Sequence, residues 1–471
     1  MQQVPARLAG RPVTADQWLE VRNPYDGSDV ARVPALGASH VDAACTAAAA
    51  ALARRDFPQH RRAAVLDRAA ELLAARAEEH ARTVALEAGK PLADARGEVA
   101  RCVDTLRFSA TEARTLAGDV VPMEASASGA GRFGFAVRQP AGVVAAITPF
   151  NFPLNLVAHK LGPAIAAGCP VVLKPADQTP LSAIRLVDLL VEAGLPDDWI
   201  SVLTGTGVDV GEPLVTHPAV RVVSFTGSVG VGRRIERVAA GKRVALELGS
   251  NSPVLVEPDA DIDRVVTAIR KAGFSYAGQS CISTQRVLVH EQLYDKLLQA
   301  LRDAVATLVV GDPMDDATEV GPLISAREIE RVLAWLRAAS DAGADVTGGE
   351  RRGNAVTPAV VADPPRDLDV YRGEVFGPVI TVTPYSDFGE AVALANDSAF
   401  GLHAGVFTND IGTALRAARE LDFGGVLINE VPTFRADQQP YGGLRDSGNT
   451  REGPAYTVDN LTELKFVMFA A

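Results

Sequence analysis

The stretch that decides the fold is residues 171–203, VVLKPADQTPLSAIRLVDLLVEAGLPDDWISVL. It begins with an apolar run, Val171–Leu173, continues through a segment of helical periodicity, Pro180–Glu192, and returns to an apolar run, Ser201–Leu203. Short apolar runs separated by a helix of this length are typical of a βαβ unit, in which a helix joins two parallel strands. The stretch therefore predicts a parallel sheet of the α/β class.

The same alternation continues on both sides of this stretch. Helical segments are predicted at Val41–Arg55 and His60–Leu86, and further helices begin at Ile262 and Tyr294. The other strand-like runs are Gly142–Ala146, Arg221–Phe225, Arg243–Ala245, Ser252–Leu255, Val287–Val289, Val379–Val382 and Val426–Ile428. Because the alternation resumes after Gly249, we expect a second α/β unit from about Leu248 to about Asn449.

Two strand-like segments fit neither unit. Arg132–Arg138 alternates in the manner of one arm of a hairpin, and Leu461–Met468 near the C-terminus is also strand-like. Both predict protruding β structure that could pair across a subunit interface. The alternative is that they are simple edge strands of the main domain.

Length, composition and charge exclude several classes of protein. The chain has 471 residues, which corresponds to two to four domains at ~100–200 residues each. Because it is 47% hydrophobic and 22% charged, a disordered chain and a small disulfide-stapled scaffold are excluded. Lys and Arg number 46 against 58 Asp and Glu, and the net charge of −12 disfavours binding to nucleic acid or to an anionic membrane.

The cysteines and the apolar stretches indicate the compartment. Cys45, Cys102, Cys169 and Cys281 are far apart and form no CxxC spacing, so neither a disulfide framework nor a metal site is expected. The N-terminal sequence lacks the basic and apolar regions of a signal peptide, and the apolar stretches are too short to span a bilayer. We therefore expect a soluble cytoplasmic protein.

Cys281 is the first candidate for chemistry. It lies in Gly278–Ile282 (GQSCI), whose small and polar residues suit a turn that exposes a thiol. A position at a helix N-terminus would also lower the pKa of the thiol. The alternative is a buried structural cysteine, which is our interpretation of Cys169, since it leads directly into an apolar run.

Two polar residues lie in apolar settings close to predicted strands. Glu247 lies between two leucines, where burial would raise its pKa toward that of a general base; the alternative is an edge-strand carboxylate in a salt bridge. Asn151 lies among aromatic residues and prolines, where a fixed amide would suit an oxyanion hole. The alternative is an asparagine that stabilises a turn.

Two glycine-rich segments, Gly205–Gly211 and Phe225–Gly232, follow strand-like runs. Glycine permits close backbone approach, and a helix N-terminus behind it favours phosphate, but tight turns use the same residues. Neither segment matches the GxGxxG fingerprint with an acid downstream. Lys174 and Asp177 close another strand, where a lysine and an acid suit ribose hydroxyls.

Together these residues resemble the aldehyde dehydrogenase superfamily, in its NAD(P)-dependent, non-acylating form. The matching blocks, in the family's order, are TPFNFP, LKPADQTP, FTGSVGVG, LELGSNSP, GQSCIS, GDPMDDATEVGPLIS, EVFGPV and PYGGLRDSG. The resemblance implies an α/β fold with a Rossmann-like parallel-sheet NAD(P)-binding domain (1–117 and 140–247) and an α/β catalytic domain (248–449). It also implies a protruding β-arm (118–139 and 450–471) that holds a homodimer or homotetramer together. The family binds its dinucleotide without the GxGxxG fingerprint.

The resemblance implies a role for each catalytic candidate. Cys281 matches the nucleophile, whose thiolate attacks the aldehyde carbon to give a thiohemiacetal. Asn151 and the backbone N–H of Cys281 would hold the oxyanion. After hydride transfer, Glu247 matches the base that activates water to hydrolyse the thioester.

The resemblance also implies the cofactor residues. Lys174 matches a contact to the adenine-side ribose, Ser228 a pyrophosphate contact, and Glu374 and Phe376 the nicotinamide-ribose anchor and its packing neighbour. Asp177 would bond the 2′-hydroxyl and repel a 2′-phosphate, which favours NAD over NADP; the family more often has Glu here, so NADP stays an alternative. The other expected contacts are Thr148, Pro149, Phe150, Gly207, Gly211, Phe225, Thr226, Gly227 and Leu248.

The positions that match the family's entry tunnel are polar. They are Arg101, Phe152, His159, Ser280, Ile282 and Arg435. The block around Arg435 resembles the branch of lactaldehyde and phosphonoacetaldehyde dehydrogenases. We therefore hypothesise a small aldehyde that bears a carboxylate, phosphate, phosphonate or several hydroxyls, since arginine binds such anions bidentately.

Several alternatives remain for these side chains. Arg435 and Arg101 would instead pair with neighbouring acids such as Asp437, Glu98 or Asp104. Arg107 and Arg286 are further basic candidates, and at most one of Arg101 and Arg107 should point inward because they do not share a helix face. His159 would be a polar tunnel wall or a satisfied helix histidine. Ser280 replaces the Arg with which some relatives grip phosphate, which disfavours a phosphate.

Three other functions compete with this hypothesis. One is oxidation of an apolar aldehyde or a semialdehyde. A second is an acylating dehydrogenase that releases an acyl-CoA, although such enzymes tend to lack the residue at Glu247. The third is a catalytically silent binding protein on the same fold.

Overall fold

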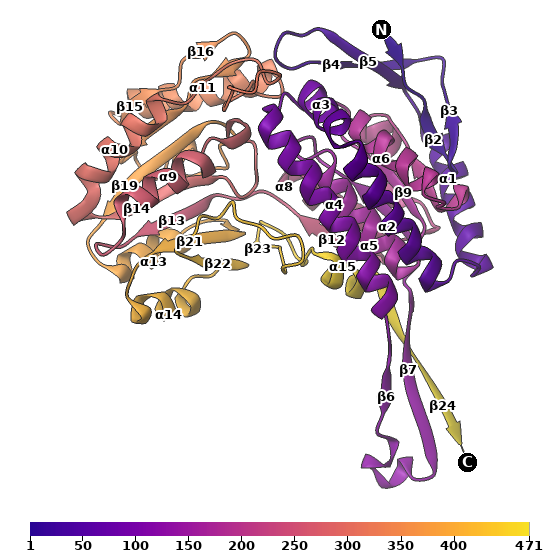
Figure 1. The fold of residues 1–471 in the computed structure, drawn as a ribbon. Coiled ribbons are helices and arrows are strands. Elements are labelled where there is room, and N and C mark those ends of the chain that lie inside the picture. The colour runs from indigo at the N-terminus through magenta and orange to yellow at the C-terminus, as the bar shows by residue number, and fades with distance from the viewer. Residues whose placement is uncertain (471) are drawn as a thin grey trace.

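The computed structural model describes residues 1–470. Two seven-stranded sheets lie side by side, each with helices on both faces, and a narrow three-stranded sheet projects from one side (Figure 1). No helix among the described residues is long and apolar enough to cross a membrane.

The first sheet has the order β12-β11-β8-β9-β10-β2-β3. Its strands are β2 (Ala6–Leu8), β3 (Arg11–Val13), β8 (Val143–Ile147), β9 (Val171–Lys174), β10 (Ile200–Val202), β11 (Val220–Thr226) and β12 (Arg243–Glu247). β8 to β12 are parallel, and β2 and β3 extend the sheet in antiparallel pairing. From β8 the chain moves outward through β9 and β10, then returns to β11 on the other side of β8. This reversal places a topological switch point between β8 and β11, where α/β sheets bind ligands.

Alternation along β8 sends side chains to two separate cores. Val144 and Ala146 pack in one core, and Val143 and Ala145 pack in the other. The first core is covered by α2 (Gln59–Ala75), α3 (Ala77–Ala88), α4 (Leu92–Thr115), α5 (Asn155–Ala167) and α6 (Leu181–Glu192). The second is covered by α1 (Ala38–Arg54), α7 (Glu212–Thr216) and α8 (Val229–Val238). Burial on both faces explains the nearly continuous apolar runs of these strands.

The second sheet has the order β15-β18-β19-β14-β13-β21-β22. Its strands are β13 (Ser252–Val256), β14 (Thr284–His290), β15 (Asp345–Gly348), β18 (Ala359–Ala362), β19 (Val379–Tyr385), β21 (His403–Phe407) and β22 (Gly425–Ile428). All are parallel except β15. One face is covered by α9 (Ile262–Ala272), α10 (Tyr294–Ala306) and α11 (Ala326–Asp341), and the other by α13 (Phe388–Asn396) and α14 (Ile411–Glu420).

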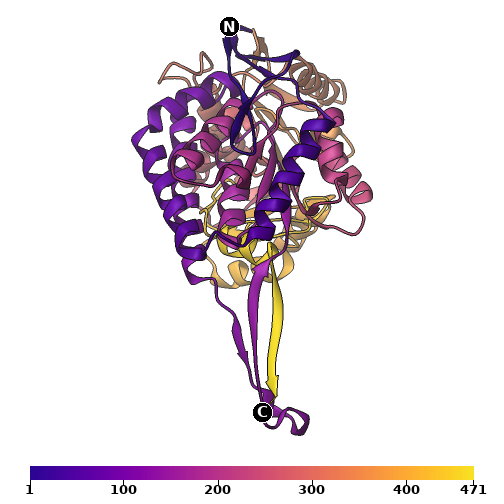
Figure 2. The ribbon, with the colours of Figure 1, turned by 90° about the vertical axis from the view of Figure 1, so that its right-hand side faces the viewer.

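The projecting sheet has the order β24-β7-β6. β6 (Asp119–Val121) and β7 (Arg132–Pro140) follow α4, and α15 (Pro454–Asn460) leads into β24 (Thr462–Ala470). β24 pairs with β7 along its whole length, so the two strand-like segments predicted from the sequence pair with each other. Figure 2 shows this sheet standing clear of both main sheets, so the alternative of simple edge strands of the main domain was wrong.

The remaining elements are short. A three-stranded N-terminal sheet has β1 (Gln2–Gln3), β4 (Trp18–Arg22) and β5 (Asp29–Pro34). The others are α12 (Asp369–Arg372), β16 (Arg351–Arg352), β17 (Ala355–Val356), β20 (Phe400–Gly401) and β23 (Leu444–Arg445).

The structure differs from the sequence-based prediction mainly in the helices near the N-terminus. The segment His60–Leu86, predicted as one helix, is split into α2 and α3 at Arg76, whose φ of −113° leaves the helical range. The uniformly high helix propensity of this Ala-, Leu- and Arg-rich stretch conceals the break. β21 was not predicted, because His403 and Gly405 are untypical of strands.

Two sheet edges meet at the centre of the molecule. β8, β9, β11 and β12 present their carboxyl ends there, while β14 and β19 present their amino ends. The segment after β23 crosses between them: the carbonyl of Ser447 accepts from Leu248 N at 3.0 Å, and the side chain of Asn449 accepts from Leu246 N at 2.9 Å. The junction therefore brings together residues that are far apart in the chain.

Candidate active site

A cavity of about 1000 Å³ opens at this junction. It is lined by α4, the start of α5, α9, the loop 275–282 and the segment 429–441. The predicted residues that line it are Arg101, Phe152, Ser280, Cys281, Ile282 and Arg435. Four separate stretches of the sequence thus supply the predicted nucleophile and five of the six predicted substrate contacts to one cavity.

Cys281 lies in a turn just before β14. The preceding loop is tightly wound, since Tyr276 and Ala277 have positive φ of 49° and 53° and a side chain on Gly278 would come within 2.1 Å of a backbone oxygen. The predicted helix N-terminus is therefore absent from Cys281. Burial raises the pKa of its thiol to about 12, opposite to the expected lowering.

The other three cysteines differ from Cys281 in exposure. Cys45, Cys102 and Cys169 are fully buried, whereas Cys281 is half-buried at the cavity wall. Cys169 therefore packs in the core, as we interpreted it. The Cys281 sulfur lies 2.8 Å from the hydroxyl of Tyr441.

Asn151 follows β8 and reaches toward the Cys281 loop. Its amide nitrogen donates to the carbonyl of Gln279 at 3.0 Å, two residues before Cys281. Its Oδ1 is buried without a hydrogen-bond partner among the described residues. The side chain is therefore fixed beside the candidate nucleophile, which is what an oxyanion donor needs.

Glu247 is the last residue of β12, an edge strand of the first sheet. It is buried, and neither carboxylate oxygen has a hydrogen-bond partner among the described residues. Burial and the negative charge of Glu452 raise its pKa well above the usual carboxyl value. The edge-strand position agrees with the alternative interpretation, but among the described residues Glu247 forms no salt bridge. Its carboxylate is therefore free to accept a proton, as a general base requires.

The carboxyl ends of β8, β9 and β11 have the features of a dinucleotide site. The hydroxyls of Thr148 and Thr226 are buried without partners in the described residues, and Lys174 Nζ donates to Asp177 at 2.7 Å. Ser228 precedes α8, whose N-terminus has no side-chain cap. Unpaired hydroxyls, a lysine–acid pair and an open helix N-terminus fit ribose and phosphate groups.

The remaining predicted cofactor residues lie around this edge. Glu374 is half-buried, accepts from Ser250 N at 2.9 Å, and has its pKa raised by desolvation to about 7. The rings of Phe150 and Phe376 meet edge to face at 5.8 Å. Leu248 packs under Gly232, and Gly207–Gly211 forms a single π-turn. Pro149, Phe225 and Gly227 also lie at the carboxyl ends of β8 and β11.

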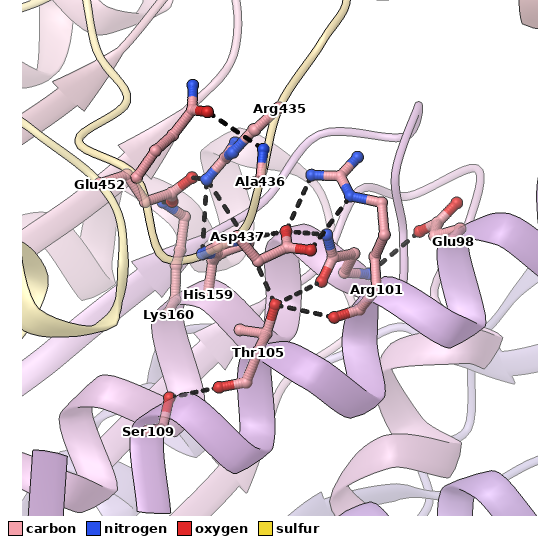
Figure 3. Close-up of polar contacts among 12 residues, drawn as sticks. Glu98, Arg101, Thr105, Ser109, His159, Lys160, Arg435, Ala436, Asp437 and Glu452 are labelled. Atoms are coloured by element: carbon pink, nitrogen blue, oxygen red, sulfur yellow. Dashed lines mark hydrogen bonds and ion pairs between the residues drawn. The ribbon is translucent and has the colours of Figure 1, made fainter. Parts of the chain in front are cut away.

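Asp437 is the hub of a buried polar network behind the cavity (Figure 3). It accepts from Arg101 Nη2 at 2.8 Å, His159 Nε2 at 2.9 Å and Asn155 Nδ2 at 3.1 Å. Burial alone would raise the pKa of Asp437, but the hydrogen bond from His159 and the charge of Arg101 lower it well below its usual value. The alternative pairing of Arg101 with Asp437 is thus correct.

Arg435 is held from the other side by Glu452. Its Nη2 donates to Glu452 at 2.8 Å, and its guanidinium lies 3.8 Å from the centre of the Tyr441 ring. Its Nε is buried without a partner among the described residues. Glu452 was not among the acids considered for this arginine, since it approaches Arg435 only through folding. Arg435 therefore pairs with an acid and keeps one unused donor, its Nε.

Three of the basic candidates do not line the cavity. His159 is fully buried and does not line the cavity, so the prediction of a tunnel-wall histidine was wrong. In its neutral form, His159 donates a hydrogen bond from Nε2 to Asp437. Its other ring nitrogen, Nδ1, lies 3.4 Å from Arg435 Nη2. Arg107 is exposed on α4 beside Asp104, at 3.7 Å. Arg286 is buried and donates to backbone carbonyls in the second unit.

The sequence did not single out Tyr441, Lys160 or Glu452. Lys160 lies 3.5 Å from Glu452 and donates to Ser224. Tyr441 belongs to the quoted block PYGGLRDSG, but nothing in the block shows what its hydroxyl touches. A charged residue on the otherwise apolar α5 was the one available signal for Lys160.

Comparison with known proteins identifies the family of the chain. The profile of the Aldehyde dehydrogenase family matches residues 12–467. The 3-sulfolactaldehyde dehydrogenase of Priestia aryabhattai is 43% identical over 456 residues, covering 97% of this chain and 95% of that protein.

Solved structures show the same fold. Aldehyde dehydrogenase 21 from Physcomitrella patens, in complex with the reaction product succinate, superposes with a TM-score of 0.97 at 39% identity and covers 100% of this chain and 98% of that chain. Glyceraldehyde-3-phosphate dehydrogenase from Methanocaldococcus jannaschii, complexed with NADP, superposes with a TM-score of 0.93 at 36% identity, covering 97% and 100%. The chain is therefore a member of the aldehyde dehydrogenase family, an enzyme that oxidises aldehydes with NAD or NADP.

Proposed function

We propose that this enzyme oxidises a small aldehyde bearing an anionic group to the carboxylic acid, with Cys281 as nucleophile and Glu247 as base. The observation that carries the substrate class is the charge at the cavity. Arg101 and Arg435 line it together with Cys281, and the Nε of Arg435 has no partner among the described residues. An anion is the group that would satisfy such a donor.

The buried network contains more basic side chains than acidic ones. Arg101, Arg435 and Lys160 are opposed by Asp437 and Glu452, whose pKa values are both lowered, and burial also lowers the pKa of Lys160. His159 is neutral, because burial and the charge of Arg435 lower its pKa. Burial and the charge of Glu452 raise the pKa of Glu247, while the charges of Arg435 and Lys160 oppose that rise. Because Arg101 and Arg435 both line the cavity, an anionic group on the substrate would be a favourable further partner for them.

The names of the relatives support the same class. One relative is named for sulfolactaldehyde, and the Physcomitrella structure contains succinate as reaction product. An aspartate-semialdehyde dehydrogenase from Pseudomonas canavaninivorans is also 42% identical over 451 residues. Sulfonate and carboxylate groups both offer oxygen acceptors to a guanidinium. We infer that the anionic group of the substrate is a sulfonate or a carboxylate, and kinetic comparison of the two aldehydes distinguishes them.

The proposed first half of the reaction uses the Cys281 turn. The thiolate attacks the aldehyde carbon, so that a C–S bond forms and the carbonyl π electrons move to oxygen. The Asn151 amide and the N–H of Cys281 are the proposed donors to that oxyanion. NAD(P)⁺, when bound, would supply the hydride acceptor. Loss of the hydride from the thiohemiacetal carbon leaves a thioester on Cys281. Thr148, Thr226, Lys174, Asp177 and Ser228 are the proposed contacts to the cofactor, with the remaining predicted cofactor residues around them.

The proposed second half depends on Glu247. Its buried, unpartnered carboxylate takes a proton from water, and the resulting hydroxide attacks the thioester carbon and expels the Cys281 thiolate. This base distinguishes the proposed hydrolytic enzyme from an acylating one, in which coenzyme A would release the acyl group. Turnover that requires free coenzyme A would contradict the proposal.

The test compares a four-carbon aldehyde that ends in a carboxylate or a sulfonate with its neutral carboxamide isostere. We expect kcat/KM to favour the anionic aldehydes by at least about tenfold, the value of one good charge-assisted contact. Arg101→Gln should remove most of that preference. Arg107→Gln, on the same helix but exposed, is the matched control and should retain it. Equal kcat/KM for charged and neutral aldehydes in the unaltered enzyme would contradict the substrate class.

We also propose that the three-stranded sheet joins subunits into a homodimer or homotetramer. The sheet is too narrow to bury its apolar side chains, and Val120, Phe133, Leu464, Phe466 and Phe469 are exposed on it. Exposed apolar patches of this kind mark association surfaces. Light scattering should give a mass of two or four chains, and Phe466→Asp should lower it; a monomer would contradict the proposal.

A further inference from the structure

We propose that Tyr441 is a catalytic group: its hydroxyl donates a hydrogen bond to the Cys281 sulfur and stabilises the thiolate before attack. The inference rests on the proposed role of Cys281 as nucleophile. Its basis is the 2.8 Å separation between the Tyr441 hydroxyl and the Cys281 sulfur, which is the one hydrogen bond that this hydroxyl makes among the described residues.

The Tyr441 ring is held rigidly in place. Its backbone exchanges two hydrogen bonds with Glu452, at 2.9 and 2.5 Å, and its side chain is 2% exposed. The ring of His403 packs edge to face against it, with ring centres 5.1 Å apart. The guanidinium of Arg435 covers the ring at 3.8 Å. Because two side chains pack against the ring and its backbone is paired, the hydroxyl has little freedom to leave the sulfur.

The direction of the hydrogen bond follows from the charge state of the sulfur. Between a thiol and a phenol, either atom is able to donate. Once the thiol gives up its proton to water, the thiolate is an acceptor only, and the phenol must be the donor. Tyr441 keeps its proton, because burial raises the pKa of the phenol well above its usual value. The hydrogen bond therefore strengthens on ionisation and lowers the pKa of Cys281.

The charged groups around the pair oppose or assist this step. Glu374 and Glu247 face the thiol, and when ionised both disfavour a second negative charge there, whereas Arg435 favours it. His403 stays neutral, because burial lowers its pKa to about 4. Arg435 also withdraws electron density through the Tyr441 ring, which makes the hydroxyl a better donor. Tyr441 thus transmits the charge of Arg435 to the reacting sulfur.

The experiment measures the ionisation of Cys281 directly, without turnover. The purified enzyme is alkylated with iodoacetamide, which is uncharged, across the neutral and alkaline range. Cys45, Cys102 and Cys169 are fully buried, so the reaction reports Cys281. In Tyr441→Phe we expect the thiol to ionise about one pH unit higher and to react about tenfold more slowly at neutral pH, as the loss of a charge-assisted hydrogen bond predicts.

Turnover gives a second readout. In Tyr441→Phe, kcat/KM at neutral pH should fall about tenfold and recover as the pH rises, because alkali restores the thiolate. A merely structural role would lower activity equally at all pH values. Tyr371→Phe is the matched control, since the hydroxyl of Tyr371 is buried without a partner in the described residues. Its alkylation profile should equal that of the unaltered enzyme.

The two proposals fail in different ways. An alkylation profile in folded Tyr441→Phe that coincides with that of the unaltered enzyme, or that shifts toward lower pH, would overturn the role of Tyr441. Retained turnover in Cys281→Ala would overturn the nucleophile instead, whatever the alkylation profile of Tyr441→Phe.

Discussion

Two buried carboxylates near the cavity, Glu247 and Asp437, have opposite surroundings. Glu247 has no hydrogen-bond partner for either oxygen within the described residues, and its pKa is raised. Asp437 accepts from Arg101, Asn155 and His159, and its pKa is lowered. A buried carboxylate without partners costs stability but is free to move a proton. A fully paired one stabilises the fold and positions its neighbours. The difference separates a reactive group from a positioning group at equal burial.

The largest expected effect is on turnover in Glu247→Gln. Removing the base should lower kcat by about 10²- to 10⁴-fold, the usual contribution of general base catalysis. The free energy of unfolding should fall by no more than about 1 kcal/mol, because no hydrogen bond to the carboxylate is lost. Steady-state NADH formation and urea unfolding measure the two quantities. A variant that is unfolded rather than slow would show that Glu247 is a structural carboxylate.

The second effect is on stability in Asp437→Asn. The amide cannot neutralise Arg101, so the free energy of unfolding should fall by about 3 kcal/mol, as for other broken buried ion pairs. The Michaelis constant for an anionic aldehyde should rise because Arg101 loses its fixed position. Urea unfolding and steady-state kinetics test both. An unchanged free energy of unfolding would show that Asp437 does not hold Arg101 in position. The proposed difference between Asp437 and Glu247 would then be wrong.

The third effect is on the pH dependence of stability, with opposite signs for the two carboxylates. The raised pKa of Glu247 makes the folded state hold a proton that the unfolded state loses above about pH 4, so its contribution to stability falls as the pH rises. The lowered pKa of Asp437 gives a contribution that is present above about pH 4 and is lost as the pH falls.

The two variants should therefore change in opposite directions and in different pH ranges. Relative to the unaltered enzyme, Glu247→Gln should gain stability as the pH rises above about 4, by up to about 1.4 kcal/mol per unit. Asp437→Asn should lose relative stability as the pH rises toward about 4, and its deficit should then stay constant up to neutrality. Thermal unfolding at a series of pH values measures both. Parallel curves for the two variants would contradict the assigned pKa directions.

The sequence predicted the surroundings of Glu247 better than those of Asp437. Glu247 stood out because a carboxylate between two leucines at a strand end is unusual, and its burial followed. Asp437 appeared as one of three acids that would pair with an arginine, but its contact with His159 joins residues from α5 and from the 429–441 segment, which meet only in the folded chain.

The fold was more predictable from the sequence than the side-chain contacts of the site. The βαβ periodicity of residues 171–203 predicted β9, α6 and β10 to within two residues. The Tyr441–Cys281 contact and the Arg435–Glu452 pair were not predictable, because they depend on how the two sheet edges meet. Spacing along the chain carries no information about that meeting.

The smallest expected effect is at an exposed pair that serves as reference for Asp437. Asp104→Asn makes the same chemical change beside Arg107, but both side chains are mostly exposed and 3.7 Å apart. The free energy of unfolding should change by less than about 0.5 kcal/mol, as for surface ion pairs in general, and kcat/KM should not change. A loss as large as that of Asp437→Asn would show that burial does not decide the effect.

The most direct test of the proposed chemistry is to trap the acyl group. Glu247→Gln is mixed with NAD⁺ and the anionic aldehyde, quenched in acid, and digested for mass spectrometry. We expect one burst of NADH per active subunit and an acyl adduct on the peptide that contains Cys281, because the thioester forms and hydrolysis is blocked. An adduct on another residue, or a burst without any adduct on Cys281, would contradict the assignment of Cys281 as nucleophile and Glu247 as the base that releases the product.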